Sequence, residues 1–407
     1  MDDAVADPER VPIRFIGLDV HKHYAVAAGV DERQYVVLSP RRVELSELPA
    51  WTAKTLQPTD VVVLEAMFNT WNLYDQLSPV VAAVVVANPA RVARMKEPGV
   101  KTDAGDALFL ARLLASGMLP TVWVPPLPTR EVRTLVTHRQ RLITQRTRSR
   151  NRLHAVLLRR GIQPPEGELF SAAKRGWWDG LELSHMEQLR VHHDLAMLET
   201  LKPLIAEAEA ELFHLSREEP WASQVAFLVQ LPGIQVLTAM VLLAAIGDIN
   251  RFPSDRKLAG YAGLGASIHD SGQTHRTGHI TKRGRRELRG TMVEAAWNAV
   301  RTHPFWKAEF SRLVEGKHLH AKAAVVAIAR QLLVVVWHVL FKREADREAI
   351  PDKVARKFLV WSYRVGRTQR AGDSCGMFVR SELNRVGLQP PPSFRLGNHV
   401  IDLAALA

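Results

Sequence analysis

From Arg14 to about Leu119, short apolar runs alternate with amphipathic segments along the chain. Runs rich in β-branched residues predict strands, and a polar link at 31–33 predicts a hairpin between the second and third of them. Asn88 and Pro89 end the last run. The pattern predicts strands at 14–19, 23–30, 34–38, 60–65 and 82–87, and helices at 46–56, with Ser46 as N-cap, and at 71–77.

Three antiparallel strands followed by alternating helices and strands is the order of an RNase H-like α/β sheet. In that topology the first strand and the strand at 60–65 are parallel neighbours. Asp19 ends the first strand and Glu65 ends the other. We therefore expect these two carboxylates side by side at the carboxyl ends of the strands, where open α/β sheets place their sites.

A second acidic pair, Asp103 and Asp106, begins a helix expected at 103–115, with Gly117 as its C-terminal stop. Residues three apart lie on one face of a helix. The simpler interpretation of this pair is that acidic residues are favourable in the first turn of any helix.

With the two strand-end carboxylates, however, the pair makes a set of four that would repel one another without a cation. Oxygen ligands of this kind are those that Mg²⁺ prefers. The sequence thus predicts a Mg²⁺ site, with room for two ions, of the type that cuts phosphodiesters.

The composition changes after a stiff, proline-rich stretch at 124–128. Residues 130–160 contain ten arginines and one acidic residue, and Leu135, Leu142 and Val156 follow a seven-residue spacing. A second helix is expected at 195–215. Its apolar seam is Leu198, Leu201, Ile205, Ala208, Leu212 and Leu215. The two helices are expected to pair with each other or to dimerise.

The arginines of 130–160 have two interpretations. They could form the solvated face of a coiled coil. Because so many positive charges with few acidic neighbours would repel one another, we favour a surface that contacts the phosphate backbone of nucleic acid. The predicted contacts on this helix are Arg139, Arg141, Arg146, Arg148, Arg150 and Arg152.

A third region begins near Trp221. The turn at 231–234, followed by a helix through 238–246, resembles half of a helix-hairpin-helix, in which backbone N–H groups hold a phosphate. A polar loop is expected at 265–284, followed by a helix at 286–300. This loop is rich in cations, and Arg276, Lys282 and Arg283 are predicted to contact nucleic acid.

The composition agrees with a nucleic-acid partner, because 54 Lys and Arg residues against 42 Asp and Glu give a formal charge of +12 over 407 residues. A single cysteine, Cys375, excludes an intramolecular disulfide. The acidic N-terminus is unlike a secretory signal, and Arg330 and Gln331 interrupt the apolar stretch at 324–341. We expect a cytoplasmic protein without a membrane partner.

Together these motifs resemble insertion-sequence transposases that pair a RuvC-like DEDD domain with a serine-bearing transposase domain. That group includes the Piv-type invertases and the bridge-RNA-guided recombinases. The resemblance covers about residues 14 to 300. The matching segments are 16–22 (IGLDVHK), 63–66 (VLEA), 88–89 (NP), 101–107 (KTDAGDA), 263–264 (GL), 271–272 (SG) and 280–284 (ITKRG).

The resemblance implies roles for particular residues. Ser271 aligns with the nucleophile that forms a covalent phosphoserine link to DNA, and Ser267 is a second candidate. It also implies a composite site between protomers of a homodimer or homotetramer, and a structured guide RNA. The implied metal-binding tetrad is Asp19, Glu65, Asp103 and Asp106.

We therefore predict an α/β plus α protein that acts as a Mg²⁺-dependent transposase or recombinase on donor and target DNA. Two alternatives stay open: a RuvC-like endonuclease that uses water only, and a non-catalytic nucleic-acid-binding regulator. The predicted parts are a RuvC-like nuclease domain (1–123), a basic helical coiled-coil region (124–220), a serine-bearing, mainly helical transposase domain (221–344) and a tail without an interpretable motif (345–407).

Overall fold

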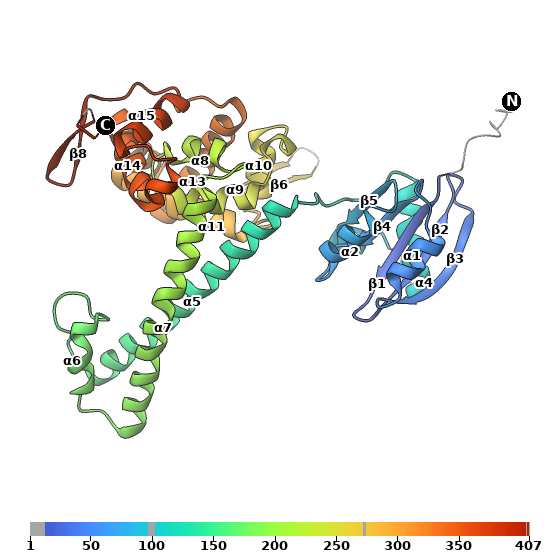
Figure 1. The fold of residues 1–407 in the computed structure, drawn as a ribbon, viewed down its shortest axis with the longest axis horizontal. Helices are drawn as coiled ribbons and strands as arrows, with labels where there is room; N and C mark the ends of the chain where they lie inside the picture. The colour runs from blue at the N-terminus through green and yellow to red at the C-terminus, as the bar shows by residue number, and fades with distance from the viewer. Residues whose placement is uncertain (1–12, 97–101, 272–273, 404, 407) are drawn as a thin grey trace. The chain divides into compact units, whose positions relative to one another are not determined.

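The computed structural model describes residues 13–96, 102–271, 274–403 and 405–406, and it leaves the side chains of 268–277 undescribed. The chain folds into two compact units, Met1–Pro125 and Pro126–Ala407 (Figure 1). The first is α/β and the second is mainly helical. The boundary between them falls inside the proline-rich stretch at 124–128.

The first unit is built on a five-stranded sheet with the order β3-β2-β1-β4-β5. β1 pairs antiparallel with β2 and parallel with β4, while β2–β3 is antiparallel and β4–β5 is parallel. This topology confirms the predicted RNase H-like fold. The strands are β1 (Phe15–Val20), β2 (Tyr24–Val30), β3 (Val36–Glu44), β4 (Val61–Glu65) and β5 (Ala83–Ala87).

Helices cover both faces of this sheet. Alternate residues of β1, Ile16 and Leu18 among them, share one buried cluster with α1 (Leu48–Thr55) and α2 (Thr70–Leu77). The other face carries α4, which spans Asp103–Ala115 as predicted. A short helix, α3 (Pro89–Val92), follows β5.

One predicted cap in this unit is wrong. Helix α1 begins at Leu48, its N-cap is Glu47, and neither Ser46 nor Glu47 provides a side-chain cap there. Pro49 lies in the first turn, and its fixed φ angle suits that position. The proline therefore sets the start of the helix two residues beyond Ser46.

The second unit begins with two long helices that lie side by side, α5 (Leu127–Arg160) and α7 (His185–Leu215) (Figure 1). Leu142 of α5 packs against Leu201 and Ile205 of α7, so the predicted seams meet within one chain. Helix α7 starts at His185 rather than 195 because Ser184 and Glu187 form a capping box there. The short helix α6 (Arg175–Asp179) packs near the far end of the pair.

The remaining elements of the second unit surround a single large core. This core joins Leu228, Leu332 and Phe358, so the segment after 344, expected as a tail, is an integral part of the fold. The helices are α8 (Ala222–Val229), α9 (Val236–Ile246), α10 (Asp255–Tyr261), α11 (Arg286–Thr302), α12 (Pro304–Ser311), α13 (Ala321–Lys342), α14 (Pro351–Gln369) and α15 (Cys375–Arg385). The hairpins are β6 (Ala266–Ser271) with β7 (Thr274–Ile280), and β8 (Ser393–Leu396) with β9 (His399–Asp402).

The segment at 265–284, expected as a polar loop, is largely the β6–β7 hairpin. No strand was predicted there because the sequence of this segment is mainly polar and lacks the apolar alternation of a half-buried strand. Helix α13, in turn, is the one described helix long and apolar enough to cross a membrane by length and composition. Half of that stretch is buried inside the unit, as expected of a core helix.

Candidate metal centre and nucleic-acid interface

Gly17 lets α4 pack directly onto the sheet beside the predicted carboxylates. A Cβ atom at Gly17 would lie 2.0 Å from the carbonyl oxygen of Ala107, a distance that no side chain tolerates. Side chains alternate along a strand, so Asp19 projects to the same face of β1 as Gly17. The close approach therefore brings the first turn of α4 over the end of β1.

The parallel pairing of β1 and β4 places the second carboxylate at the same sheet edge. Leu18 pairs with Leu64, and Asp19 and Glu65 are the next residue of each strand. Val63 packs against the face covered by α4, and Glu65, two residues later, shares that face. The ends of β1 and β4 therefore form the sheet edge that the sequence predicts.

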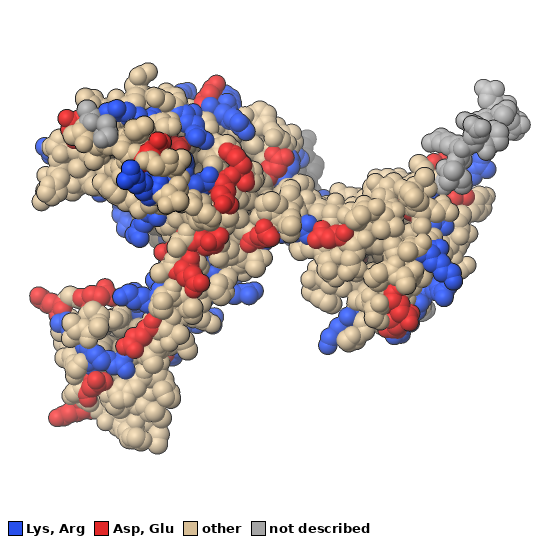
Figure 2. Space-filling model, viewed as in Figure 1, with Lys and Arg blue, Asp and Glu red and all other residues tan. Residues whose placement is uncertain are grey.

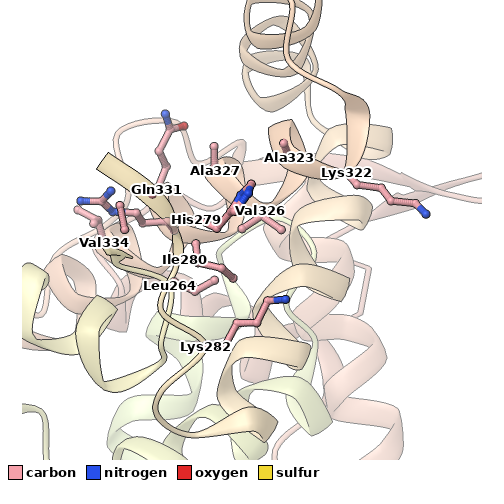
Figure 3. A pocket seen from close by; sticks show the side chains of 13 residues that line it. Leu264, His279, Ile280, Lys282, Lys322, Ala323, Val326, Ala327, Gln331 and Val334 are labelled. Atoms are coloured by element: carbon pink, nitrogen blue, oxygen red, sulfur yellow. The ribbon is translucent and has the colours of Figure 1, made fainter. Parts of the chain in front are cut away.

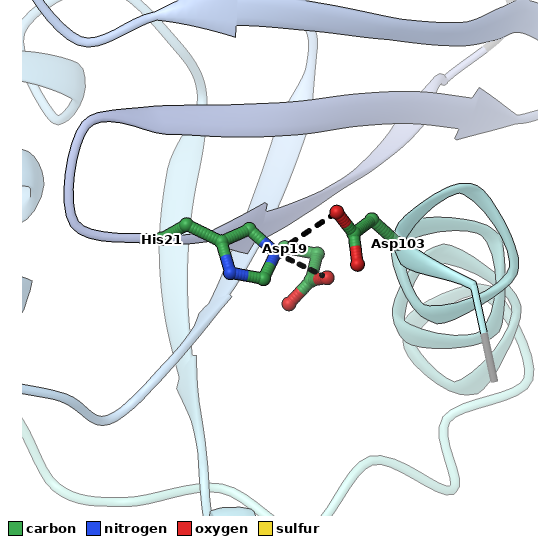
Figure 4. Close-up of side chains that lie close together, drawn as sticks. All are labelled: Asp19, His21 and Asp103. Carbon is green, nitrogen blue, oxygen red and sulfur yellow. Dashed lines mark hydrogen bonds and ion pairs between the residues drawn. The ribbon is translucent and has the colours of Figure 1, made fainter.

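Three side chains converge at this edge: Asp19, His21 and Asp103 (Figure 4). The His21 Nε2 atom lies 3.2 Å from Oδ2 of Asp19 and 3.3 Å from Oδ2 of Asp103. One ligand atom from each of the three lies within 4.8 Å of the others. The group joins the end of β1, the turn that follows it and the first turn of α4.

Tyr24 holds this group from the side of β2. Its hydroxyl donates a hydrogen bond to Oδ2 of Asp103 at 2.9 Å, and its ring stacks on His21 with a centroid distance of 4.6 Å. The Arg42 guanidinium lies 3.7 Å from the centroid of the same ring. The bond to the Asp103 carboxylate raises the pKa of the Tyr24 hydroxyl, which therefore keeps its proton as a donor.

Asp106 lies close by and has its own partner. Its Oδ1 atom is 2.9 Å from Nζ of Lys96, and its side chain is only 14% exposed. Neither Asp106 nor Glu65 belongs to the group within 4.8 Å formed by the described residues. The structure thus brings two of the four predicted ligands together and places the other two beside them.

The electrostatics of Asp19 favour a bound cation. Its side chain is 16% exposed. Burial raises the pKa of the carboxyl group, His21 opposes that shift, and the charges of Asp106 and Asp103 add to it. Two carboxylates and an imidazole are compatible with a divalent cation, which would offset this cost. The acidic cluster is therefore compatible with a divalent metal.

Three members of this site, His21, Tyr24 and Lys96, were not among the predicted site residues. His21 had a usable signal, because it follows Asp19 by two positions and the side-chain period of a strand is two. Tyr24 and Lys96 reach the site from β2 and from the segment after α3. Only the packing of those elements reveals them.

The predicted nucleophile lies in the second unit. Ser271 is the last residue of β6 and pairs with Thr274. The side chains of Ser271 and Arg276, and all of Gly272, lie outside the described residues. Ser267, the second candidate, donates its hydroxyl to the carbonyl oxygen of His279 at 3.0 Å. That bond engages the Ser267 hydroxyl within the hairpin.

A glycine at the base of this hairpin allows a close backbone contact. A Cβ atom at Gly284 would lie 2.2 Å from the carbonyl oxygen of Tyr261, so the exit of β7 packs onto the end of α10. Lys282, one of the predicted nucleic-acid contacts, adopts a left-handed φ of 54° in the same turn. Its neighbour Arg283, also predicted, is exposed.

A cavity of about 810 Å³ separates the hairpin from α13 (Figure 3). Its wall is mainly apolar, with Leu264 and Ile280 on one side and Val326 on the other. Its charged lining residues are the cations Lys282, Lys322 and Arg330. The cavity between α13 and the hairpin therefore has cations that could attract an anion.

The long basic helix is only partly free to meet nucleic acid. Nε of Arg139 donates to Glu209 at 2.9 Å, and Nε of Arg152 donates to Asp194 at 2.9 Å, both across the α5–α7 pair. Arg150 lies 3.4 Å from Glu168. Acidic and basic side chains are accordingly mixed along this pair (Figure 2). The expectation that these arginines have few acidic neighbours was wrong, because α7 supplies Glu209 and Asp194.

The other three predicted contacts on this helix differ. Arg141, Arg146 and Arg148 form no ion pair with any residue that the structure describes. Arg141 and Arg148 are exposed and seven residues apart, so they share one face of α5. This face is the part of the basic helix whose charge is available to a phosphate backbone.

An RNase H-like sheet with carboxylates gathered at the end of β1 and the start of α4 is typical of nuclease and transposase domains. In agreement, residues 16–161 match a family model of the IS110-type DEDD transposase domain. Residues 225–311 match the "Transposase IS116/IS110/IS902 family". The chain belongs to the IS110/IS116 family of insertion-sequence transposases, and it is an enzyme that cleaves and recombines DNA.

Several transposases resemble this chain over most of its length. A putative transposase, y4qE, of Sinorhizobium fredii is 28% identical, covering 90% of this chain and 91% of its own. The transposase of the insertion sequence IS1111A of Coxiella burnetii is 25% identical over 82% of this chain and 92% of its own. The transposase of IS1533 of Leptospira borgpetersenii is 23% identical, with 78% and 92% covered. Both units of this chain are thus present in proteins named as transposases.

Proposed function

We propose that this transposase exchanges strands between donor and target DNA through a covalent phosphoserine link at Ser271. In this proposal Mg²⁺ is held by Asp19, Glu65, Asp103 and Asp106, and a structured RNA guides the choice of DNA. The observation that carries the proposal is the convergence of Asp19 and Asp103 on His21 at one sheet edge. Clustered carboxylates of this kind serve phosphoryl transfer in many enzymes.

The proposed chemistry is a pair of transesterifications. The Ser271 hydroxyl loses its proton, its oxygen bonds to phosphorus, and the bond from phosphorus to one deoxyribose oxygen breaks. The released sugar hydroxyl gains a proton. In the reverse direction, a hydroxyl from a different strand attacks the phosphoserine, which restores a phosphodiester and frees the serine. The number of phosphodiesters is unchanged, so the exchange needs no external energy source.

The chain itself would supply charge and position for these steps. Lys282, Arg283 and Arg276 follow or flank Ser271 on the hairpin and would neutralise the attacked phosphate. Bound Mg²⁺ would add positive charge at the developing oxyanion. His21 and Tyr24 would keep the Asp103 carboxylate oriented, because both contact its Oδ2 atom.

The partners belong to the same proposal. Donor and target DNA and the guide RNA would contact α5, with Arg141, Arg146 and Arg148 free of ion pairs among the described residues. The metal ligands and Ser271 would complete each active site across protomers of a dimer or tetramer. The reaction would take place in the cytoplasm, where the chromosome of a bacterium lies.

The decisive experiment compares two serine variants of the full chain. We expect Ser271→Ala to abolish both recombination and the covalent protein–DNA adduct seen after denaturing electrophoresis. Ser267→Ala, the matched control in the same strand, should keep both. Asp19→Asn should abolish the adduct as well, because it removes a metal ligand.

A rival function is a RuvC-like endonuclease that uses water and leaves Ser271 structural. The observation that favours it is that the carboxylate cluster is formed within the first unit alone. If Ser271→Ala still cleaved DNA at the same position without an adduct, the serine mechanism would be wrong and this rival would stand.

A further inference from the structure

An exposed aromatic side chain lies near the carboxylate edge and has no part in the site described above. Phe68 is 75% exposed, on the loop 66–69 that joins β4 to α2. It follows Glu65, the last residue of β4, by three positions. Three residues of chain span at most about 11 Å, so the Cα atom of Phe68 lies within that distance of the Cα atom of Glu65. The loop therefore leaves the same sheet edge at which Asp19 and Asp103 meet.

The loop is anchored on both sides of Phe68. The N–H of Ala66 donates to the carbonyl oxygen of Ala87 on the neighbouring strand at 3.0 Å. The N–H of Met67 donates to the hydroxyl oxygen of Thr70 at 2.6 Å, and the Met67 side chain packs against the core of the sheet. Thr70 begins α2 and is only 1% exposed. These anchors leave Phe68 as the exposed residue of the loop.

An exposed aromatic ring is not by itself a sign of function, because folded proteins leave much apolar surface in contact with water. The place of Phe68 in the fold is what gives it a meaning. Its ring favours a partner that removes it from water, and the planar bases of DNA are such partners. Stacking on an aromatic ring tolerates every base, because each base has a π face. This chain cleaves and recombines DNA, so its activity brings bases to the protein.

The same edge offers positive charge to the backbone of a DNA strand. Lys22 is exposed in the turn that follows β1, and it forms no ion pair with any residue that the structure describes. β1 and β4 are hydrogen-bonded neighbours, about 4.8 Å apart, so Lys22 and Phe68 leave adjacent strand ends. A cation for phosphate and a ring for a base therefore stand at the edge that carries the carboxylates.

We propose that Phe68 stacks on a base of the DNA strand whose phosphodiester lies at the carboxylate edge. The stacked base fixes the sugar and phosphate next to it, so the ring is a positioning contact for the strand that is cut. Taking a base away from its neighbours in the duplex costs free energy, and the new stack offsets part of this cost. The inference rests on the proposed function, in which the metal held at this edge acts on DNA.

The test compares two short single strands with the same phosphates, oligothymidine and an abasic strand of equal length. Each is titrated with the full-length protein in the presence of Mg²⁺. We expect the unchanged protein to prefer the strand with bases. Phe68→Ala should lower the ratio of the two affinities about tenfold, which corresponds to about 1.4 kcal/mol and is typical of one base–aromatic stack. Phosphate contacts elsewhere on the chain cancel in this ratio.

Three further variants make the result specific to stacking at this edge. Phe68→Trp should keep the preference for bases, whereas Phe68→Leu should lose most of it, because leucine is apolar but has no π face. Tyr35→Ala is the matched control and should keep the ratio. Tyr35 is 69% exposed and lies at the opposite end of the sheet, since it precedes Val36, which pairs with the last residue of β2. All four changes are at exposed positions and should leave the melting temperature unchanged.

Three outcomes overturn the inference. An unchanged ratio in Phe68→Ala would mean that the ring does not meet a base. Full activity of Phe68→Leu in the same comparison would mean an apolar contact without stacking. A Phe68→Ala protein that loses self-association in sedimentation, with its ratio unchanged, would assign the ring to a protein interface.

The proposed function fails separately from this inference. Asp19→Asn should weaken the binding of both strands alike, because the metal holds phosphate that both strands carry. Phe68→Ala should weaken only the strand with bases. If Asp19→Asn changed neither affinity while Phe68→Ala lowered the ratio, the metal role would be wrong and the stack would stand.

Discussion

Gly17 and Ala107 are in such close contact that a single methyl group would not fit between them, because it would lie 2.0 Å from the Ala107 carbonyl oxygen. This contact fixes the height of α4 above β1 and thus the distance from Asp103 to Asp19. The metal centre therefore depends on a residue that contributes no ligand.

Gly17→Ala should displace α4, with a loss of stability of about 1–3 kcal/mol from overpacking and a loss of adduct formation. Denaturant unfolding and the adduct assay measure the two effects. Gly290→Ala is the matched control, since a Cβ atom there meets nothing within 4 Å and the residue lies inside α11. That change should stabilise the chain by roughly 0.5–1 kcal/mol. An active Gly17→Ala protein would contradict the proposed dependence.

The carboxylate cluster predicts stabilisation by a divalent cation. Mg²⁺ or Mn²⁺ should raise the melting temperature of the first unit by several degrees, because only the folded state presents Asp19 and Asp103 together. Asp19→Asn should abolish this response in a thermal-shift assay. Glu47→Gln changes an exposed carboxylate of the same unit and should leave the response unchanged. A response that survives Asp19→Asn would place the ion elsewhere.

The basic helix predicts two different results for two pairs of arginines. Arg141→Ala with Arg148→Ala should reduce the salt slope of duplex-DNA binding by about 1.8, two contacts of about 0.9 each, with no loss of stability. Arg139→Ala with Arg152→Ala should instead weaken the α5–α7 pair, by roughly 0.2–1 kcal/mol for each ion pair. Both pairs remove the same charge, so each serves as the control of the other. Identical effects on binding would mean that the helix acts only through its net charge.

Lys357 predicts a pH dependence of stability. Its pKa is lowered by burial to about 7 in the folded chain, against an ordinary value of about 10.4. Between these values the unfolded state binds the extra proton, so this residue makes stability rise with pH from about pH 7 to about pH 10. The rise should be absent in Lys357→Met and present in Lys342→Met, which removes an exposed lysine at the end of α13. Denaturant unfolding across this range measures it, and equal slopes in both variants would refute the assignment.

The proposed composite site predicts complementation between two inactive chains. Asp19→Asn and Ser271→Ala proteins should each be inactive. Their mixture after subunit exchange should regain about a quarter of full activity, because about half of the random dimers are mixed and one of the two sites in each mixed dimer is intact. A mixture of Ser271→Ala with Asp19→Asn/Ser271→Ala is the control and should stay inactive. If the first mixture also stays inactive although exchange has occurred, the metal ligands and the serine act within one chain.

Much of the first unit could be predicted from the chain alone. Continuous apolar runs between turn residues predicted β1, β4 and β5 closely, and Gly117 was expected to stop α4, which ends at Ala115. Asp19 and Glu65 could be predicted at one sheet edge because each ends an apolar run and the order of the elements makes the two strands parallel neighbours. Local propensity and apolar periodicity are properties of adjacent residues, and they survive without tertiary contacts.

What the sequence by itself determined was the order of strands and helices, the acidic residues at strand and helix ends, and the cationic surplus. Only the tertiary structure decided which charges remain free. Arg139 and Arg152 are neutralised by α7, while Arg141 and Arg148 on the same helix form no ion pair with any described residue. It also decided that His21 and Tyr24 support Asp103. Pairing of charges and burial of polar atoms depend on contacts between residues far apart in the chain, so no local pattern can reveal them.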